Sequence, residues 1–138
     1  YAELASKLQE PFVSCGTGFS QLASAEALDG PQDCVVEMKD AYAHRLQIAL
    51  DVLRKYDLYR YSPGGAIYLL IDISKSGISS HEFAIKLLQE KRVAVAPGNT
   101  FGRMCTDHVR VSIASSDENI RSGITSICEM VHELHSQS

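Results

Sequence analysis

Hydrophobic residues recur at three- and four-residue intervals in two long stretches, as they do on one face of an amphipathic helix. The first helix is expected to begin at Pro31, because proline suits the first helical position. Its hydrophobic stripe consists of Val35, Met38, Tyr42, Leu46, Ala49 and Leu53. The second helix, near the C-terminus, has the stripe Ile120, Ile124, Ile127, Val131 and Leu134. Each stripe predicts one buried helix face.

Shorter helices are expected before Pro31. Residues 2–8 predict a short helix that Pro11 stops, since proline has no backbone N–H to donate. A loop of small residues, 14–18, separates it from a helix over residues 20–28. Gly30 is expected to end that helix in the left-handed conformation that glycine adopts without strain.

Two capping boxes predict further helix starts, because a serine and a glutamate three residues later can each bond the other's backbone N–H. Ser79 with Glu82 introduces a helix through about Lys91. Ser115 with Glu118 does the same for the C-terminal helix. The helix that follows Ser79 has the hydrophobic stripe Phe83, Ala84, Leu87 and Leu88.

Strands are expected where the pattern changes to alternation. They are predicted over residues 58–61, 66–73 and 93–96, and the turn 62–65 (SPGG) joins the first two. The run AIYLLIDI at 66–73 is hydrophobic almost throughout, so this strand is expected to be central in its sheet.

The strand around Arg110 has two distinct faces. Its hydrophobic face consists of Val109, Val111 and Ile113, and its opposite face of His108, Arg110 and Ser112. An arginine on a rigid strand can bind a carboxylate or phosphate through two parallel hydrogen bonds. The alternative is that Arg110 is only solvated, as most surface arginines are.

These elements predict an α+β fold, a two-layer sandwich in which helices pack over a small, mostly antiparallel sheet. The 138 residues fit one domain and can bury a core, and 45% hydrophobic with 22% charged residues is usual for a soluble globular protein. A net charge of −4 argues against a broad nucleic-acid surface. No hydrophobic run approaches the roughly 20 residues that span a membrane.

The polar residues form no self-contained active site. The cysteines, at positions 15, 34, 105 and 128, form no CxxC pair and are expected to be free thiols, as in the cytoplasm or another reducing compartment. No HExxH or other metal site and no GxSxG nucleophile is present, and the glycine-rich loop 15–18 lacks a nucleotide-binding pattern. Lys75 is expected to be a solvated loop residue rather than a Schiff-base lysine, which needs a desolvated pocket.

Five segments follow one another in a recognisable order. They are FSQLASAEALDGPQD at 19–33, the stretch from Tyr42 to Arg45, SPGGAIYLLIDIS at 62–74, LLQEKRVAVAPGNTFG at 87–102 and DHVRVSIASSDENI at 107–120. In this order they resemble the C-terminal portion of a class I, fold-type I pyridoxal-phosphate-dependent aminotransferase of the aspartate-aminotransferase-like group. The resemblance covers most of the chain.

The resemblance implies specific roles. Arg110 matches the arginine that binds the substrate α-carboxylate, and Phe101, after the Pro-Gly turn, would line the approach to the substrate. Residues 1–30 would continue from a large domain, and residues 31–138 would form the small domain. The implied partners are an L-amino acid, a 2-oxo acid, the upstream large domain and a second subunit of a homodimer, with no nucleic acid and no membrane.

The cofactor residues of the family are not matched in this chain. No lysine has the neighbourhood of the family's Schiff-base lysine, and the residues that hold the cofactor ring belong upstream. The resemblance therefore implies pyridoxal 5'-phosphate in the complete enzyme, and a chain that by itself binds no cofactor and is inactive. The alternatives are a non-catalytic interaction domain derived from the family and a regulatory domain that binds amino acids through Arg110.

Overall fold

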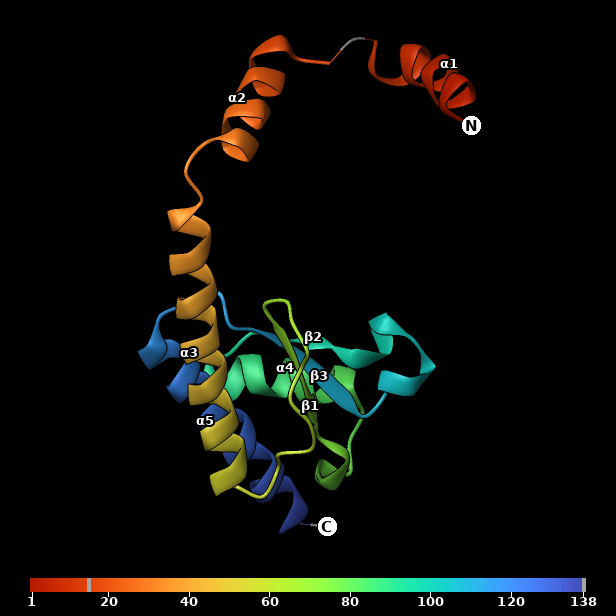
Figure 1. The fold of residues 1–138 in the computed structure, drawn as a ribbon. Helices are drawn as coiled ribbons and strands as arrows, with labels where there is room; N and C mark the ends of the chain where they lie inside the picture. Colours follow the sequence, from red (N-terminus) through yellow and green to blue (C-terminus); the bar gives the residue numbers. More distant parts are fainter. Residues whose placement is uncertain (15, 138) are drawn as a thin grey trace. The chain divides into compact units, whose positions relative to one another are not determined.

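The computed structural model describes residues 1–14 and 16–137 and divides the chain into two compact units, 1–37 and 38–138 (Figure 1). Cys15 lies outside the described residues, so the prediction of a free thiol there is untested. The first unit contains α1 (Ala2–Val13), α2 (Gly18–Asp29) and the start of α3 (Asp33–Lys55). Neither α1 nor α2 has a buried residue.

In the first unit, the predicted end of α1 is wrong; the predicted end of α2 at Gly30 is confirmed, but its left-handed conformation is not. Helix α1 continues through Pro11 to Val13. A proline this close to the end of a helix removes only one hydrogen bond from the last turn, so the helix persists. Gly30 does end α2, but in an extended conformation with φ −76° and ψ −176°, and its N–H closes the last turn on the carbonyl of Glu26 at 2.8 Å.

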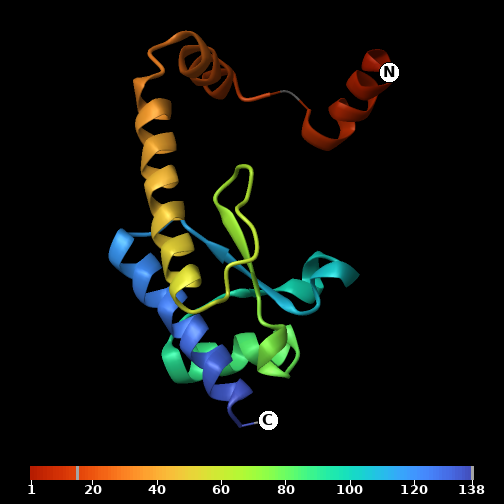
Figure 2. The same ribbon diagram turned by 60° about the horizontal axis from the view of Figure 1, so that its bottom comes forward.

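The second unit confirms the predicted α+β fold. Strands β1 (Tyr68–Asp72), β2 (Ala96–Pro97) and β3 (His108–Ser112) form an antiparallel sheet in the order β1-β3-β2. Its helices are the rest of α3, α4 (Ser80–Lys91) and α5 (Asp117–His135). The short 3₁₀ helices are η1 (Ser74–Ser76), η2 (Gly98–Phe101) and η3 (Arg103–Cys105), of which η2 and η3 project away from α5 (Figure 2).

Alternation along β3 is confirmed, since Val109 and Ile113 are buried and Val111 packs against the core. The other predicted strands need correction. Strand β1 is shorter than expected and lies at an edge, because β3 is the strand with a partner on each side. Residues 58–61 form no strand: the N–H of Leu58 bonds the carbonyl of Leu53 at 2.9 Å, and its side chain fills the core. Strand β2 shares only Ala96 with the predicted segment.

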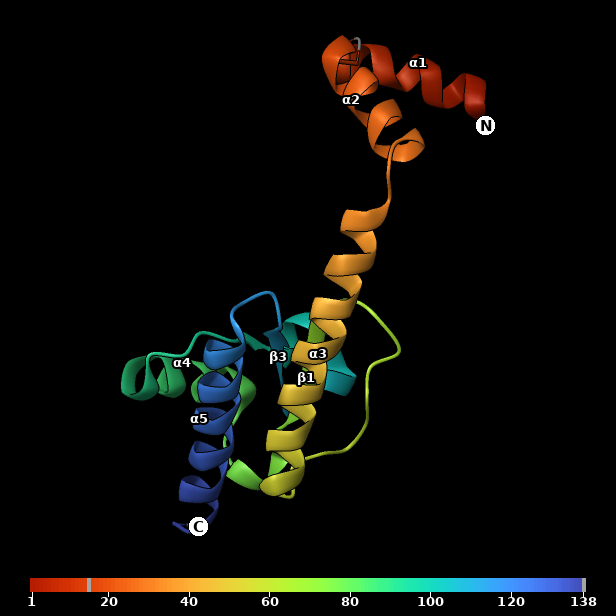
Figure 3. The ribbon, with the colours of Figure 1, turned by 60° about the vertical axis from the view of Figure 1, so that its left-hand side comes forward.

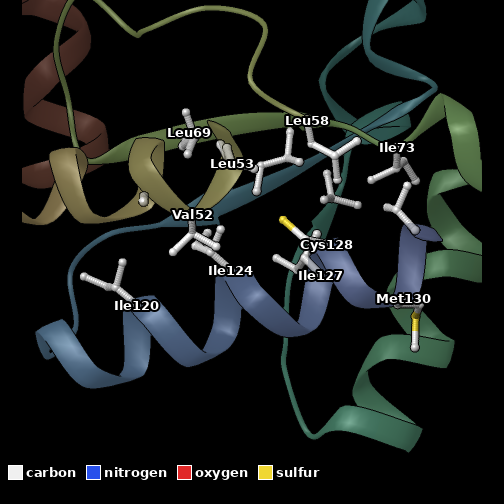
Figure 4. Close-up of a cluster of buried hydrophobic side chains, with 14 of the residues drawn as sticks. Val52, Leu53, Leu58, Leu69, Ile73, Ile120, Ile124, Ile127, Cys128 and Met130 are labelled. Atoms are coloured by element: carbon white, nitrogen blue, oxygen red, sulfur yellow. The ribbon is translucent and has the colours of Figure 1, made fainter. Parts of the chain in front are cut away.

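The core lies where one face of the sheet meets α3, α4 and α5. Figure 4 shows side chains of α3, β1 and α5 converging on it, among them Val52, Leu69 and Ile124. Helices α3 and α5 run side by side (Figure 3), and Asp117 at the start of α5 pairs with Arg45 at 3.5 Å and His44 at 3.2 Å. Lys91 of α4 pairs with Glu133 of α5 at 2.9 Å.

The predicted stripe of α3 is buried only in part. Ala49 and Leu53 are buried, but Val35 and Met38 are 50% and 52% exposed. The helix begins at Asp33, two residues after Pro31, and Tyr42 is its first residue that packs against the core. Periodicity identifies the face of a helix that is hydrophobic, but not how much of its length another element covers.

The stripes of α4 and α5 are largely confirmed. Phe83 and Leu87 of α4 are fully buried, whereas Leu88 is 49% exposed. In α5 the four isoleucine and valine positions of the stripe are buried, and Leu134 is half-buried against the core.

The capping box of Ser79 and Glu82 is confirmed: the Ser79 Oγ accepts from the Glu82 N–H, and the Glu82 carboxylate accepts from the Ser79 N–H. The second predicted box is wrong by one residue. Ser116, not Ser115, caps α5 and accepts from the N–H of Asn119 at 3.3 Å. Either serine can cap a helix through its hydroxyl, so the backbone conformation decides between them.

Ser79→Ala is expected to lower the free energy of unfolding by about 1 kcal/mol, because the Glu82 N–H loses its acceptor at the start of α4. Urea denaturation at neutral pH measures the loss. Ser122→Ala is the matched control: Ser122 is exposed inside α5, where alanine favours the helix, so this variant should be as stable as the wild type. Equal stability of Ser79→Ala and Ser122→Ala would contradict the capping role.

Three cysteines are described, and all three are free thiols as expected. Cys34 is exposed, Cys105 is half-buried and Cys128 is buried. Burial, together with the charge of Glu129, raises the pKa of the Cys128 thiol to about 12. Cys128 is therefore a core residue rather than a reactive group.

Candidate functional site

Arg110 lies on the face of β3 opposite the core and is half-buried. Its Cα is paired with Leu70 on β1 and with Ala96 on β2. Because β3 is flanked on both sides, the backbone that carries Arg110 is fixed by two neighbouring strands. Within the described part of the chain, no carboxylate forms an ion pair with this guanidinium.

Two aromatic rings contact the Arg110 guanidinium. Its Cζ lies 4.3 Å from the centroid of the Tyr68 ring and 4.3 Å from that of the Phe101 ring. Both distances are within the usual range of a cation–π contact. Sequence reasoning identified Arg110 and Phe101 as site residues, and the structure brings them together. Sequence reasoning missed Tyr68. Alternation places Tyr68 on the same face of β1 as Leu70, and Leu70 is paired with Arg110, so the pairing of β1 with β3 is the information that was needed.

A shallow pocket of about 300 Å³ opens beside Arg110. It is lined by Tyr68, Ala94, Val95, Ala96, Arg110 and Ser112. Its lining combines one cation with an aromatic residue, three small hydrophobic residues and a serine. Such a surface suits a small organic acid, whose carboxylate would meet the guanidinium.

The segment that carries Phe101 is fixed to two other elements. The backbone N–H of Asn99 donates to Ser80 Oγ of α4 at 3.4 Å, and Thr100 Oγ1 donates to the carbonyl of Pro97 at 2.7 Å. Gly98 is buried directly against the backbone carbonyls of Cys105 and His108, where no Cβ fits. The position of Phe101 thus depends on a close backbone contact between η2 and the start of β3.

A second polar group, around Asp72, lies at the other end of the β1–β3 pair. Asp72 is opposite His108, accepts from the Ser74 N–H at 2.8 Å and pairs with Arg60 at 3.4 Å. Burial by itself would raise the pKa of Asp72, but the bonds from Ser74 and Arg60 and the nearby His108 lower it below its usual value. Arg60 is therefore paired with Asp72, whereas Arg110 has no ion-pair partner among the described residues.

Asp72→Asn is expected to lower stability at pH 7, with a difference from the wild type that shrinks in acid. Because the pKa of Asp72 is lowered by folding, its charge stabilises the fold above the unfolded-state pKa of about 3.9, and this contribution is lost as the pH falls through the lower folded-state pKa. Urea denaturation of both proteins at pH 7 and at pH 3 tests this. A difference that stays constant with pH would contradict the prediction.

The chain's lysines are all exposed or half-exposed. All six are described, and none is buried. Lys75, which was expected to be solvated, is half-exposed and pairs with Asp57 at 3.3 Å.

No cluster of three or more His, Cys, Asp or Glu side chains that could hold a metal ion is found among residues 1–14 and 16–137. Over the same residues, no helix has the length and hydrophobicity needed to cross a membrane.

Comparison with known proteins gives consistent matches. An aspartate aminotransferase of Bacillus sp. (strain YM-2) is 41% identical over 121 residues, covering 83% of this chain and 30% of that protein. The putative aminotransferase YugH of Bacillus subtilis (strain 168) is 31% identical over 127 residues, covering 92% of this chain and 33% of that protein. The crystal structure of an aromatic aminotransferase from Pyrococcus horikoshii OT3 superposes with a TM-score of 0.85 at 31% identity, covering 92% of this chain and 35% of that one.

The chain thus spans about a third of the length of the curated relatives it matches. The model of the family "Aminotransferase class I and II" matches residues 1–127, which is nearly the whole chain. This match confirms the resemblance inferred from the ordered motifs, and the structural superposition agrees with it. The chain belongs to the class I and II aminotransferase family.

Proposed function

We propose that this chain is the C-terminal small domain of a pyridoxal-phosphate-dependent aminotransferase. Residues 31–138 form the small domain, and residues 1–30 continue from a large domain that precedes it. The complete enzyme transfers the amino group of an L-amino acid to a 2-oxo acid and acts as a homodimer. The family match and the share of each relative that the chain spans support this assignment.

In this proposal Arg110 binds the α-carboxylate of the substrate. The observation that supports this role is that Arg110 is half-buried beside an open pocket and that no described carboxylate is paired with its guanidinium. A carboxylate in that pocket can accept two parallel hydrogen bonds, each worth roughly 1.5–3 kcal/mol because both groups are charged. Phe101 lines the approach to the same guanidinium.

The chain's contribution to the reaction is to bind and orient. A carboxylate held by two bonds cannot rotate freely, so the Cα–H of the substrate points in one direction relative to the rest of the active site. Hydrophobic surface around Arg110, from Tyr68 and Phe101, would exclude water when the small domain closes over its substrate.

Pyridoxal phosphate belongs to the complete enzyme in this proposal, where it supplies the electron sink. The chain alone would bind no cofactor and have no activity, since its lysines are exposed or half-exposed. Several of them are already paired with carboxylates of their own unit.

The test compares this 138-residue chain with the product of the complete open reading frame that encodes it, each mixed with pyridoxal phosphate. We expect no borohydride-reducible lysine adduct with the chain alone. The complete product should form one and transfer amino groups between L-amino acids and 2-oxo acids. A stoichiometric adduct on the chain alone would overturn the proposal, because the chain would then hold the cofactor by itself. A complete product without aminotransfer would also overturn it and would favour a non-catalytic domain.

A further inference from the structure

Arg110 is the cation with the most extensive aromatic contact in the described chain. Arg45, Arg54 and Lys55 each lie over a single ring, at 5.5, 4.8 and 5.9 Å from its centroid. Arg110 instead has two rings, both at 4.3 Å. The two rings come from β1 and from η2, which are far apart in the sequence.

Core packing does not explain these two aromatic residues. Tyr68 is 43% exposed and Phe101 is 45% exposed, and neither is among the residues that pack in or against the core, whereas Phe83 is fully buried there. A large aromatic side chain that served only the core would be buried like Phe83. Their shared feature is contact with the guanidinium of Arg110.

We propose that Tyr68 and Phe101 are positioning residues that hold the Arg110 guanidinium in one orientation before the substrate binds. The ligand class follows from the proposed function, on which this inference rests: a carboxylate of an amino acid or 2-oxo acid. An unrestrained arginine loses rotamer freedom when it binds, which costs affinity. An arginine already stacked on two rings has less freedom to lose, and its N–H groups stay directed at the ligand.

The backbone around the rings is built to keep them in place. Tyr68 is paired with Ser112 in the β1–β3 ladder, two positions from the Leu70–Arg110 pair and therefore on the same face of the sheet. Phe101 ends η2, whose start is packed against the carbonyls of Cys105 and His108 at Gly98. Neither ring position depends on the substrate, so the orientation of Arg110 is set in the free protein.

The ring of Tyr68, not its hydroxyl, makes the contact with Arg110. Substitutions can therefore test the ring and the hydroxyl separately. Tyr68→Phe should preserve carboxylate recognition, whereas Tyr68→Leu should weaken it. Phe101→Tyr and Phe101→Leu form the matching pair at the second ring. Tyr61→Leu is the control, because Tyr61 is another exposed tyrosine and has no ring contact with Arg110 among those that the structure shows.

The experiment records the Arg110 side-chain Nε–Hε signal by NMR in the ¹⁵N-labelled chain, with the signal assigned from Arg110→Lys. In the wild type we expect a ring-current shift of this signal without ligand, and a further shift on titration with pyruvate that sodium chloride of equal ionic strength does not produce. Each leucine variant should lose part of the ring-current shift and bind pyruvate about threefold to tenfold more weakly. Tyr68→Phe, Phe101→Tyr and Tyr61→Leu should match the wild type.

The outcomes separate the two proposals. If the wild-type signal does not respond to pyruvate, Arg110 is not a carboxylate-binding residue and the proposed function fails. If it responds but shows no ring-current shift, or if the leucine variants bind as tightly as the wild type, the positioning role is wrong and the proposed function stands. The ring-current shift is read from the wild type, so the test holds even if a leucine variant does not fold.

Discussion

Arg110→Ala is expected to lower kcat/KM for an L-amino acid by about 10²- to 10⁴-fold in the complete enzyme. The variant loses two charge-assisted hydrogen bonds to the α-carboxylate, together worth roughly 3–6 kcal/mol, and each 1.36 kcal/mol is tenfold in rate. Binding of pyridoxal phosphate should stay unchanged, because Arg110 lies beside a pocket whose lining includes no lysine. Steady-state kinetics and a cofactor titration measure the two effects.

An amine without a carboxylate gives the sharpest control for this prediction. It cannot use Arg110, so wild type and variant should process it at equal rates. Arg110→Lys keeps the charge but not the planar fork, and should lie between the wild type and Arg110→Ala. Wild-type turnover of the amino acid by Arg110→Ala, or an equal loss with the amine, would refute the role of Arg110.

Gly98→Ala is expected to cost about 3 kcal/mol in the free energy of unfolding, near the upper end for an overpacked site. A Cβ at this position would collide with the backbone carbonyls of Cys105 and His108, and neither can move without shifting β3 or η3. The same displacement should carry Phe101 away from Arg110, so the Arg110 side-chain signal should lose ring-current shift. Urea denaturation and the NMR spectrum measure the two consequences.

Gly64→Ala is the matched control for Gly98→Ala. No atom lies within 4 Å of a Cβ at Gly64, and this residue is exposed, so its substitution should change stability by less than about 0.5 kcal/mol. If Gly98→Ala is as stable as Gly64→Ala, the close contact between η2 and the start of β3 does not hold Phe101 in place.

The local sequence pattern predicted which helices and strands are present better than it predicted the residues at which they begin and end. The stripes of α3, α4 and α5 are real, as is the capping of α4 by Ser79. Pro11 did not stop α1, because a proline in the last turn removes only one backbone hydrogen bond of the helix. Leu58 was mistaken for a strand residue because burial of a single side chain after a helix produces the same alternation as a strand.

The sequence by itself determined which family the chain resembles, which face of β3 is polar and that Arg110 and Phe101 are candidate ligand-binding residues. These features depend on motif order and on alternation, which are local properties of the chain. Only the tertiary structure decided that β3, not β1, is the central strand, and that the rings of Tyr68 and Phe101 meet at one guanidinium. The physical reason is that these contacts require strand register and a close backbone approach between segments far apart in the sequence, and no local pattern specifies either.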